Sequence, residues 1–136
     1  MARVFITGTT GFIGSHLLNE MINEDIKEFI LLVRDEEKAS EKLSAVIKKA
    51  KNKGKKIDFV IGDISKNNLG LSEQEIELAR NCEEVYHLAC NVSLSRKWKD
   101  KREIFRSNFK GTKNILEVFK NSDKLKQMYI FSSAYA

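Results

Sequence analysis

A glycine-rich stretch near the start of the chain constrains its fold more than any other feature of the sequence. An apolar run, Val4–Ile6, precedes three glycines, Gly8, Gly11 and Gly14, in the spacing Gly-x-x-Gly-x-x-Gly. Apolar residues then recur at helical spacing as far as Ile22, so the stretch predicts a strand, a tight turn and a helix. Gly8 would let the chain turn sharply, Gly11 would leave room for a ligand beside the backbone, and Gly14 would let the helix pack closely on the sheet.

A turn of this kind is typical of nucleotide binding. The helix after it directs free N–H groups and the positive end of its dipole toward the turn, which favours phosphate groups. The spacing differs from the commoner Gly-x-Gly-x-x-Gly, and a plain strand-to-helix turn is the alternative interpretation. The pattern of the remaining chain favours the nucleotide-binding turn, because strands and helices alternate after it.

That alternation predicts an α/β fold with a doubly wound parallel sheet of the Rossmann type. Right-handed crossovers give the strand order 3-2-1-4-5, with the glycine turn at the switch point of the sheet. We expect one NAD(P)-binding domain over residues 1–136 that is truncated after its fifth strand. The expected strands are Val4–Thr7, Phe29–Val33, Ile57–Ile61, Glu84–Leu88 and Met128–Phe131. The expected helices are Phe12–Asn23, Glu36–Asn52, one that opens at the capping box Ser72–Glu75, and one from a capping box at Asp100–Glu103 to Asn121.

Composition limits the class of protein. The longest strongly apolar run, Phe29–Val33, is too short to span a membrane, and only three residues precede the first strand, so no signal peptide is expected. Cys82 and Cys90 are not spaced as a metal-binding pair, and no metal site is expected. Two lone cysteines in such a domain are typically reduced thiols, which indicates a cytoplasmic protein.

The formal net charge of +5 is concentrated in two basic runs, Lys48–Lys56 and Arg96–Arg102. A nucleic-acid patch is one interpretation. The favoured interpretation is that the first run is a solvated helix end and the second a solvated loop, because cations complement a helix C-terminus. No nucleic-acid partner is therefore expected, although either run could steer an anionic small molecule or carrier.

Several short motifs occur in an order that resembles a known superfamily. They are Gly8–Gly14, Asp63-Ile64, His87–Cys90, Asn108–Thr112 and Ser132–Tyr135. In this order they resemble the extended short-chain dehydrogenases/reductases. Leu31–Arg34 and Ser133–Ala136 make the chain most similar to the male-sterility, fatty acyl-CoA reductase and thioester reductase branch.

The resemblance implies a dinucleotide site and part of a catalytic centre. Ser133 would hydrogen-bond the substrate carbonyl oxygen, and Asn108 would support the catalytic centre. The backbone of Phe12 and Ile13 would hold the pyrophosphate, Asp63 would accept a hydrogen bond from the adenine amino group, and Ile64 would flank the ring. The complete set of cofactor residues implied by the resemblance is Gly8, Thr10, Gly11, Phe12, Ile13, Gly14, Arg34, Asp63, Ile64, Ala89, Cys90 and Asn91, of which Ala89 to Asn91 would line the ribose and nicotinamide side.

Structural interpretations stand beside the functional ones. Asp63 follows a strand and could simply cap a turn. Asn108 falls on the apolar stripe of the last helix, where a buried amide needs partners in any case. The other members of this expected stripe are Ile104, Phe105, Phe109, Thr112, Ile115, Leu116 and Phe119. His87 is expected to be structural, and His16 to face solvent.

Arg34 bears on the choice of cofactor. An acidic residue after the second strand suits the ribose 2′-hydroxyl of NAD, and an arginine suits the 2′-phosphate of NADP. Arg34 stands twenty residues after Gly14, and its guanidinium can pair bidentately with a phosphate. Asp35 comes next and could instead meet the hydroxyl. NADP is therefore the expected cofactor, and NAD the less favoured one.

The chain departs from the superfamily pattern in its catalytic acid. The general acid of the superfamily is a Tyr with a Lys four positions later, and no Tyr-x-x-x-Lys occurs in these 136 residues. The chain therefore resembles the cofactor-binding part of a longer reductase, which would act on acyl-CoA or an acyl carrier protein to give an aldehyde or alcohol. By themselves these residues are expected to bind NADPH with little or no turnover.

Other functions remain open at this point. One is an NAD-dependent sugar-nucleotide epimerase or dehydratase of the same superfamily, and another is a non-catalytic dinucleotide-binding module. The fifth strand would also be a bare sheet edge, so a homodimer or self-association through that edge is expected.

Overall fold

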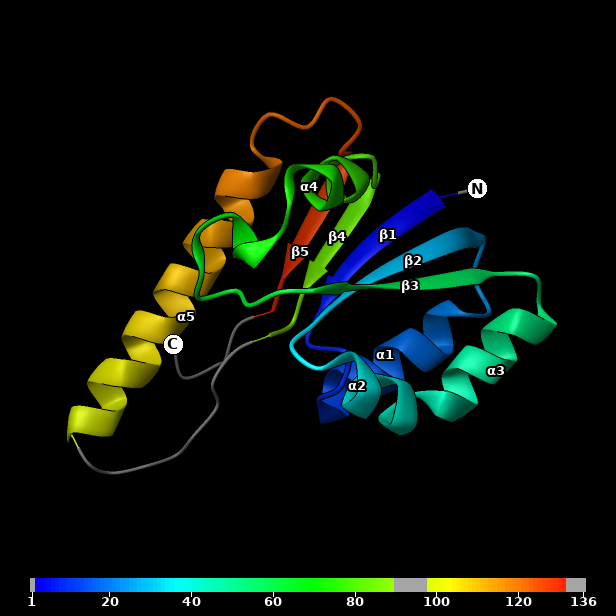
Figure 1. Ribbon diagram of the computed structural model, residues 1–136, viewed down its shortest axis with the longest axis horizontal. Helices are drawn as coiled ribbons and strands as arrows, with labels where there is room; N and C mark the ends of the chain where they lie inside the picture. Colours follow the sequence, from blue (N-terminus) through cyan, green and yellow to red (C-terminus); the bar gives the residue numbers. More distant parts are fainter. Residues whose placement is uncertain (1, 90–97, 132–136) are drawn as a thin grey trace.

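The computed structural model describes residues 2–89 and 98–131. Within them, five parallel strands form one sheet in the order β3-β2-β1-β4-β5, which confirms the predicted topology (Figure 1). The central strands are apolar because both faces of the sheet are covered. The strands are β1 (Ala2–Thr7), β2 (Ile26–Val33), β3 (Lys56–Ile61), β4 (Glu84–His87) and β5 (Gln127–Ile130).

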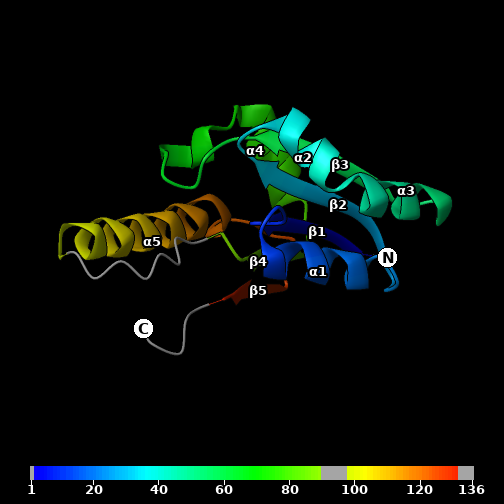
Figure 2. The same cartoon turned by 90° about the horizontal axis from the view of Figure 1, so that it is seen from below.

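Helices pack on both faces of this sheet and enclose two hydrophobic cores (Figures 1 and 2). In the first core, Leu18 and Leu43 lie against Ile6 and Phe29. In the second, Phe119 packs edge-on against Phe5, with the ring centroids 5.2 Å apart. The helices on the first face are α1 (Phe12–Met21), α2 (Glu36–Lys42) and α3 (Ser44–Asn52), and those on the second are the 3-10 helix η1 (Asn67–Gly70), α4 (Glu73–Arg80) and α5 (Trp98–Phe119).

Two of the predicted helices differ from those in the structure. The single helix expected over Glu36–Asn52 is two helices, because Leu43 leaves the helical conformation (φ −100°, ψ 14°) while its side chain is buried. The capping box expected at Asp100–Glu103 is wrong, since α5 begins at Trp98 and position 100 already lies within it. The capping box at Ser72–Glu75 is confirmed, with both of its reciprocal hydrogen bonds present.

The apolar stripe of α5 also requires a correction. Phe105 and Phe109 are 74% and 62% exposed, although the helical spacing predicted them on the same face as the buried Ile115. In Figure 1 only the C-terminal half of α5 lies over the sheet. Even in that half Leu116, on the same side of the helix as Phe109, is 46% exposed, so this side of α5 faces away from the core. Apolar periodicity identifies a helix face but does not say which part of it a neighbour covers.

Candidate functional site

The glycine turn between β1 and α1 lies at the carboxyl end of β1, which is flanked by β2 and β4. Gly8 has a φ of +80°, and a Cβ at this position would lie 2.6 Å from the backbone nitrogen of Ala89. A Cβ on Gly14 would lie 1.9 Å from the carbonyl oxygen of Gly8. Both clashes are with backbone, so the turn can pack this closely only with glycine at these two positions.

Gly11 has a different role in the same turn. It is exposed, and a Cβ there would meet only the carbonyl oxygen of Gly8, at an ordinary distance of 3.4 Å. Gly11 is also the N-cap of α1, and no side chain of the described residues caps this helix end. The first-turn N–H groups and the positive end of the helix dipole therefore face a space that none of the described residues fills.

A hydrogen-bonded cluster ties this turn to β4. The hydroxyl oxygen of Thr7 lies 2.7 Å from Nδ1 of His87, and it accepts a hydrogen bond from the backbone N–H of Ala89 at 3.1 Å. Thr7 and His87 are both buried and are register partners on adjacent strands. Burial lowers the pKa of His87, which favours the neutral imidazole. His87 is thus structural, as predicted, and it helps to hold Ala89 beside the turn.

Thr9, inside the turn, carries an unsatisfied polar group. Its side chain is buried, and its hydroxyl oxygen has no hydrogen-bond partner within the part of the chain that the structure describes. Leaving a buried hydroxyl without a partner costs about 1–3 kcal/mol. The unpaired hydroxyl, the open space at Gly11 and the uncapped helix end together fit a bound diphosphate.

The exposed side chains of the turn belong to its outer rim. Phe12 and Ile13 are both exposed, and Thr10 is half-buried. The ring of Phe12 packs against His16, with the ring centroids 4.6 Å apart, and the backbone carbonyl of Phe12 lies 2.9 Å from Nδ1 of that histidine. His16 is exposed, which confirms the prediction that it faces solvent.

Arg34 and Asp35 follow β2 and have separate roles. Both side chains are exposed. Asp35 is the N-cap of α2, and its Oδ1 accepts a hydrogen bond from the backbone N–H of Lys38 at 3.1 Å. The Asp35 carboxylate is therefore engaged by its own helix, while the Arg34 guanidinium adds a positive charge at the carboxyl end of β2.

Asp63 follows β3 and does cap a turn, as the structural interpretation expected. Its Oδ1 accepts hydrogen bonds from the backbone N–H and the hydroxyl of Ser65, at 2.9 and 2.8 Å. These two hydrogen bonds are the main reason why the pKa of the Asp63 carboxyl is lowered, and the positive charges of Arg34 and Lys66 lower it further. The electrostatic effect of Arg34 on Asp63 means that the ends of β2 and β3 form one polar region.

Two more of the predicted site residues, Ile64 and Asn108, are half-buried. The carbonyl oxygen of Ile64 accepts a hydrogen bond from Nδ2 of Asn114 at 2.7 Å. Asn108 lies on α5. Sequence reasoning singled out Asn108 and missed Asn114, although a polar residue three positions after Gly111 on a helix that packs on a sheet is itself a signal.

Other predicted residues lie outside the described part of the chain. They are Cys90, Asn91 and Ser133. The structure therefore brings together the glycine turn, Ala89, Arg34, Asp63 and Ile64 at the carboxyl ends of the strands.

Comparison with protein families and known proteins identifies this arrangement. A family model described as "Male sterility protein" matches residues 6–136. The chain belongs to the male sterility protein family. The resemblance to the reductase branch of the extended short-chain dehydrogenases/reductases is thereby confirmed.

The relatives of this male sterility domain are much longer proteins. Nonribosomal peptide synthetase asaC of Aspergillus flavus is 32% identical over 85% of the chain and 12% of its own length. "Putative fatty acyl-CoA reductase CG8303" of Drosophila melanogaster is 29% identical over 96% of the chain and 25% of its own length. The terminal R domain of the myxalamid PKS-NRPS pathway has the same fold, with a TM-score of 0.76 and 24% identity over 98% of the chain and 35% of that structure.

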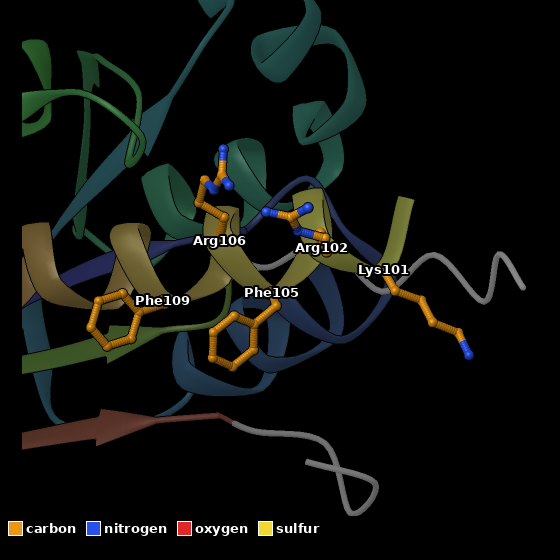
Figure 3. Close-up of a pocket in the computed structure, with 5 residues that line it drawn as sticks. All are labelled: Lys101, Arg102, Phe105, Arg106 and Phe109. Carbon is orange, nitrogen blue, oxygen red and sulfur yellow. The ribbon is translucent and has the colours of Figure 1, made fainter. Parts of the chain in front are cut away.

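A second surface feature of the male sterility domain lies on α5. A hollow of about 500 Å³ is lined by Lys101, Arg102, Phe105, Arg106 and Phe109. In Figure 3 the two phenylalanine rings project from one side of the helix and the two arginines from another. Each described residue that lines this hollow belongs to α5, and none of them belongs to the glycine turn.

Residues 2–89 and 98–131 contain neither a candidate metal site nor a helix that could span a membrane. No group of three or more His, Cys, Asp or Glu side chains there could hold a metal ion. None of the helices in these ranges combines the length and apolar character needed to cross a bilayer. Burial raises the pKa of Cys82 to about 12, so this thiol is protonated at neutral pH.

Proposed function

We propose that the chain is the NADP-binding domain of a reductase that transfers hydride to an acyl thioester. The observation that carries this proposal is the open space at Gly11, beside the uncapped start of α1. Among the described residues no backbone or side chain enters this space, although a Cβ at Gly11 would make only an ordinary contact. Membership of the male sterility family supports an oxidoreductase with a nicotinamide cofactor.

In this proposal the backbone N–H groups of Phe12 and Ile13 hold the pyrophosphate at the positive end of the α1 dipole. Thr10 borders the same position. The hydroxyl of Thr9, which lacks a partner among the described residues, gains one from the bound diphosphate or an ordered water. The nicotinamide, when bound, supplies the hydride, and Ala89, Cys90 and Asn91 would line its side of the site.

The charges at the ends of β2 and β3 support NADP over NAD. Arg34 is exposed and can pair bidentately with a 2′-phosphate. Asp35, the residue that suits a 2′-hydroxyl, already accepts a hydrogen bond from the backbone of α2. Asp63 presents its carboxylate next to this position and would receive the adenine amino group, with Ile64 against the ring.

The thioester substrate is inferred from the relatives. One of them is a nonribosomal peptide synthetase, one is named as a fatty acyl-CoA reductase, and one solved structure is a terminal R domain. We infer that the substrate is acyl-CoA or an acyl group on a carrier protein. Ser133 would donate a hydrogen bond to the thioester carbonyl oxygen, and Asn108 would support that centre.

These 136 residues are proposed to bind the cofactor without turning over a substrate. Proton transfer to the carbonyl oxygen needs a positioned acid, and the sequence contains no Tyr-x-x-x-Lys. Acyl-CoA-dependent oxidation of NADPH by this chain should therefore stay at background. Robust turnover would mean that the acid has been misplaced.

A titration with NADPH and NADH tests the proposal. Gly11→Ala should lower the affinity for both by at least about tenfold, or ~1.4 kcal/mol, because the added Cβ occupies the phosphate position. The same change should cost only about 1 kcal/mol of unfolding free energy, since alanine is a poorer N-cap than glycine. Gly54→Ala is the matched control: Gly54 has a φ of +70° with no atom within 4 Å of an added Cβ.

The Gly54→Ala variant should show a similar loss of stability without any loss of affinity. Wild-type chain that binds neither nucleotide would overturn the proposal. Equal affinity of wild type and Gly11→Ala would show that the turn is only a structural connection.

A further inference from the structure

A contact between distant parts of the chain reaches the adenosine side of the candidate site. Asn114 on α5 is only 7% exposed, and its Nδ2 donates a hydrogen bond to the carbonyl oxygen of Ile64 at 2.7 Å. A buried side-chain amide is costly unless its groups are paired. This bond therefore fixes the position of the Ile64 backbone relative to α5.

A second residue of α5 meets the same isoleucine. Gly111, one turn before Asn114, is buried, and a Cβ there would lie 2.7 Å from Cδ1 and 3.3 Å from Cγ1 of Ile64. Residues three apart lie on the same face of a helix. Asn114 thus holds the backbone of Ile64, and the missing side chain at Gly111 makes room for the isoleucine side chain.

The segment after Ile64 has a backbone that benefits from such an anchor. Asn68, Leu69 and Gly70 have successive φ values of +54°, +59° and +68°, a region that is unfavourable for residues with side chains. The segment closes back on its start, because the N–H of Asp63 donates to the carbonyl oxygen of Leu69 at 2.9 Å. Leu69 is fully buried and packs into the core that α5 also covers.

We propose that α5 positions the adenosine-binding segment of the cofactor site through Asn114 and Gly111. This inference rests on the proposed function, because it concerns the same nucleotide site. Asn114 and Gly111 are positioning residues. They act through Ile64, which would flank the adenine ring, and through Asp63 next to it, which would accept from the adenine amino group.

Two variants test the inference, and each is measured with NADPH and with adenosine 2′,5′-bisphosphate, which carries only the adenosine half. Asn114→Asp keeps the shape but places an acceptor oxygen against the Ile64 carbonyl oxygen. The affinity for both ligands should fall by about tenfold. Hydrogen exchange over residues 63–70 should become faster. Asn121→Asp, the same change at an exposed position two residues after the end of α5, should alter neither.

Gly111→Ala separates positioning from folding. Alanine stabilises a helix interior relative to glycine, so the melting temperature should stay the same or rise. The new methyl group pushes the Ile64 side chain, so the affinity for adenosine 2′,5′-bisphosphate should fall severalfold. A purely structural role for Gly111 would not give higher stability with weaker binding. If Asn114→Asp does not fold, this variant decides the question.

The outcomes are distinct. A wild-type chain that binds NADPH, with Asn114→Asp and Gly111→Ala binding both ligands equally well, overturns this inference alone. Wild type that binds neither ligand overturns the proposed function, and this inference with it. Loss of NADPH affinity with unchanged affinity for the bisphosphate also overturns it, because the effect would then lie outside the adenosine half.

Discussion

The hydroxyl oxygen of Thr7 lies 2.7 Å from Nδ1 of His87, and this contact joins the carboxyl ends of the two strands that flank the switch point of the sheet. The same hydroxyl oxygen accepts the N–H of Ala89. The same hydroxyl also pairs with Nδ1 of the neutral imidazole, and the tautomer of His87 sets which of the two groups donates. A single threonine therefore holds the last residue of β4 and the backbone that borders the glycine turn.

Replacing Thr7 should lower the free energy of unfolding, whereas replacing Thr9, two residues later, should not. Thr7→Val leaves Nδ1 of His87 and the N–H of Ala89 without their partner, and the unfolding free energy should fall by about 2 kcal/mol. Thr9→Val removes a buried hydroxyl that has no partner among the described residues, so the ligand-free protein should be as stable as wild type or slightly more stable. Urea unfolding of the two isosteric variants measures both values. Equal losses would mean that the cluster around Thr7 does not hold the turn.

The stability of the protein should depend on His87 in weakly acidic solution. Burial lowers the pKa of His87 in the folded state, so the unfolded chain takes up a proton first as the pH falls. Stability is fully present above about pH 6.5, the ordinary value for histidine, and decreases below it by at most ~1.4 kcal/mol per pH unit. His87→Asn should abolish this part of the decrease, while His16→Asn, at an exposed histidine, should retain it. Parallel curves for wild type and His87→Asn would contradict the assignment.

The sheet could be predicted from the sequence because its signals are local. Short apolar runs, the glycine turn and the alternation with helices are enough to give the strand order once crossovers are right-handed. The break at Leu43 was not predicted, since the apolar spacing continues through it. Phe105 and Phe109 were placed on the wrong face, because the apolar spacing of α5 does not reveal which side of the helix the sheet covers.

In the candidate site, too, some features could be predicted from the sequence and others could not. The roles of Gly8 and Gly14 follow from a sequence pattern, and the structure agrees with the close approaches that the pattern implies. The contact of Thr7 with His87 depends on the register of two strands that are eighty residues apart. The contact of Asn114 with Ile64 depends on how far α5 reaches across the sheet. No local sequence pattern predicts either contact, so only the three-dimensional structure reveals them.

Arg34 should select the cofactor. Arg34→Ala should lower the affinity for NADPH about ten- to hundredfold, the usual worth of a charge-assisted hydrogen-bonded pair, and leave NADH binding nearly unchanged. Arg102→Ala removes the same charge from the exposed face of α5 and should change neither affinity. Fluorescence titration of the reduced nucleotides gives both constants. An equal loss for NADPH and NADH in Arg34→Ala would indicate general electrostatic steering instead of recognition of the 2′-phosphate.

The edge formed by β5 should mediate self-association. Among the described strands, β5 and β3 are the two edges of the sheet, and Ile130 on β5 and Ile61 on β3 are 44% and 43% exposed. An unpaired strand with exposed apolar side chains can pair with a second copy, and a lysine on such an edge opposes that pairing. Sedimentation should show association that rises with protein concentration, and Ile130→Lys should shift the protein toward monomer. Ile61→Lys tests the opposite edge with the same chemical change and should have little effect, because β3 already carries Lys56. A wild type that sediments as a monomer at every concentration, or a stronger effect of Ile61→Lys, would refute the assignment of this edge.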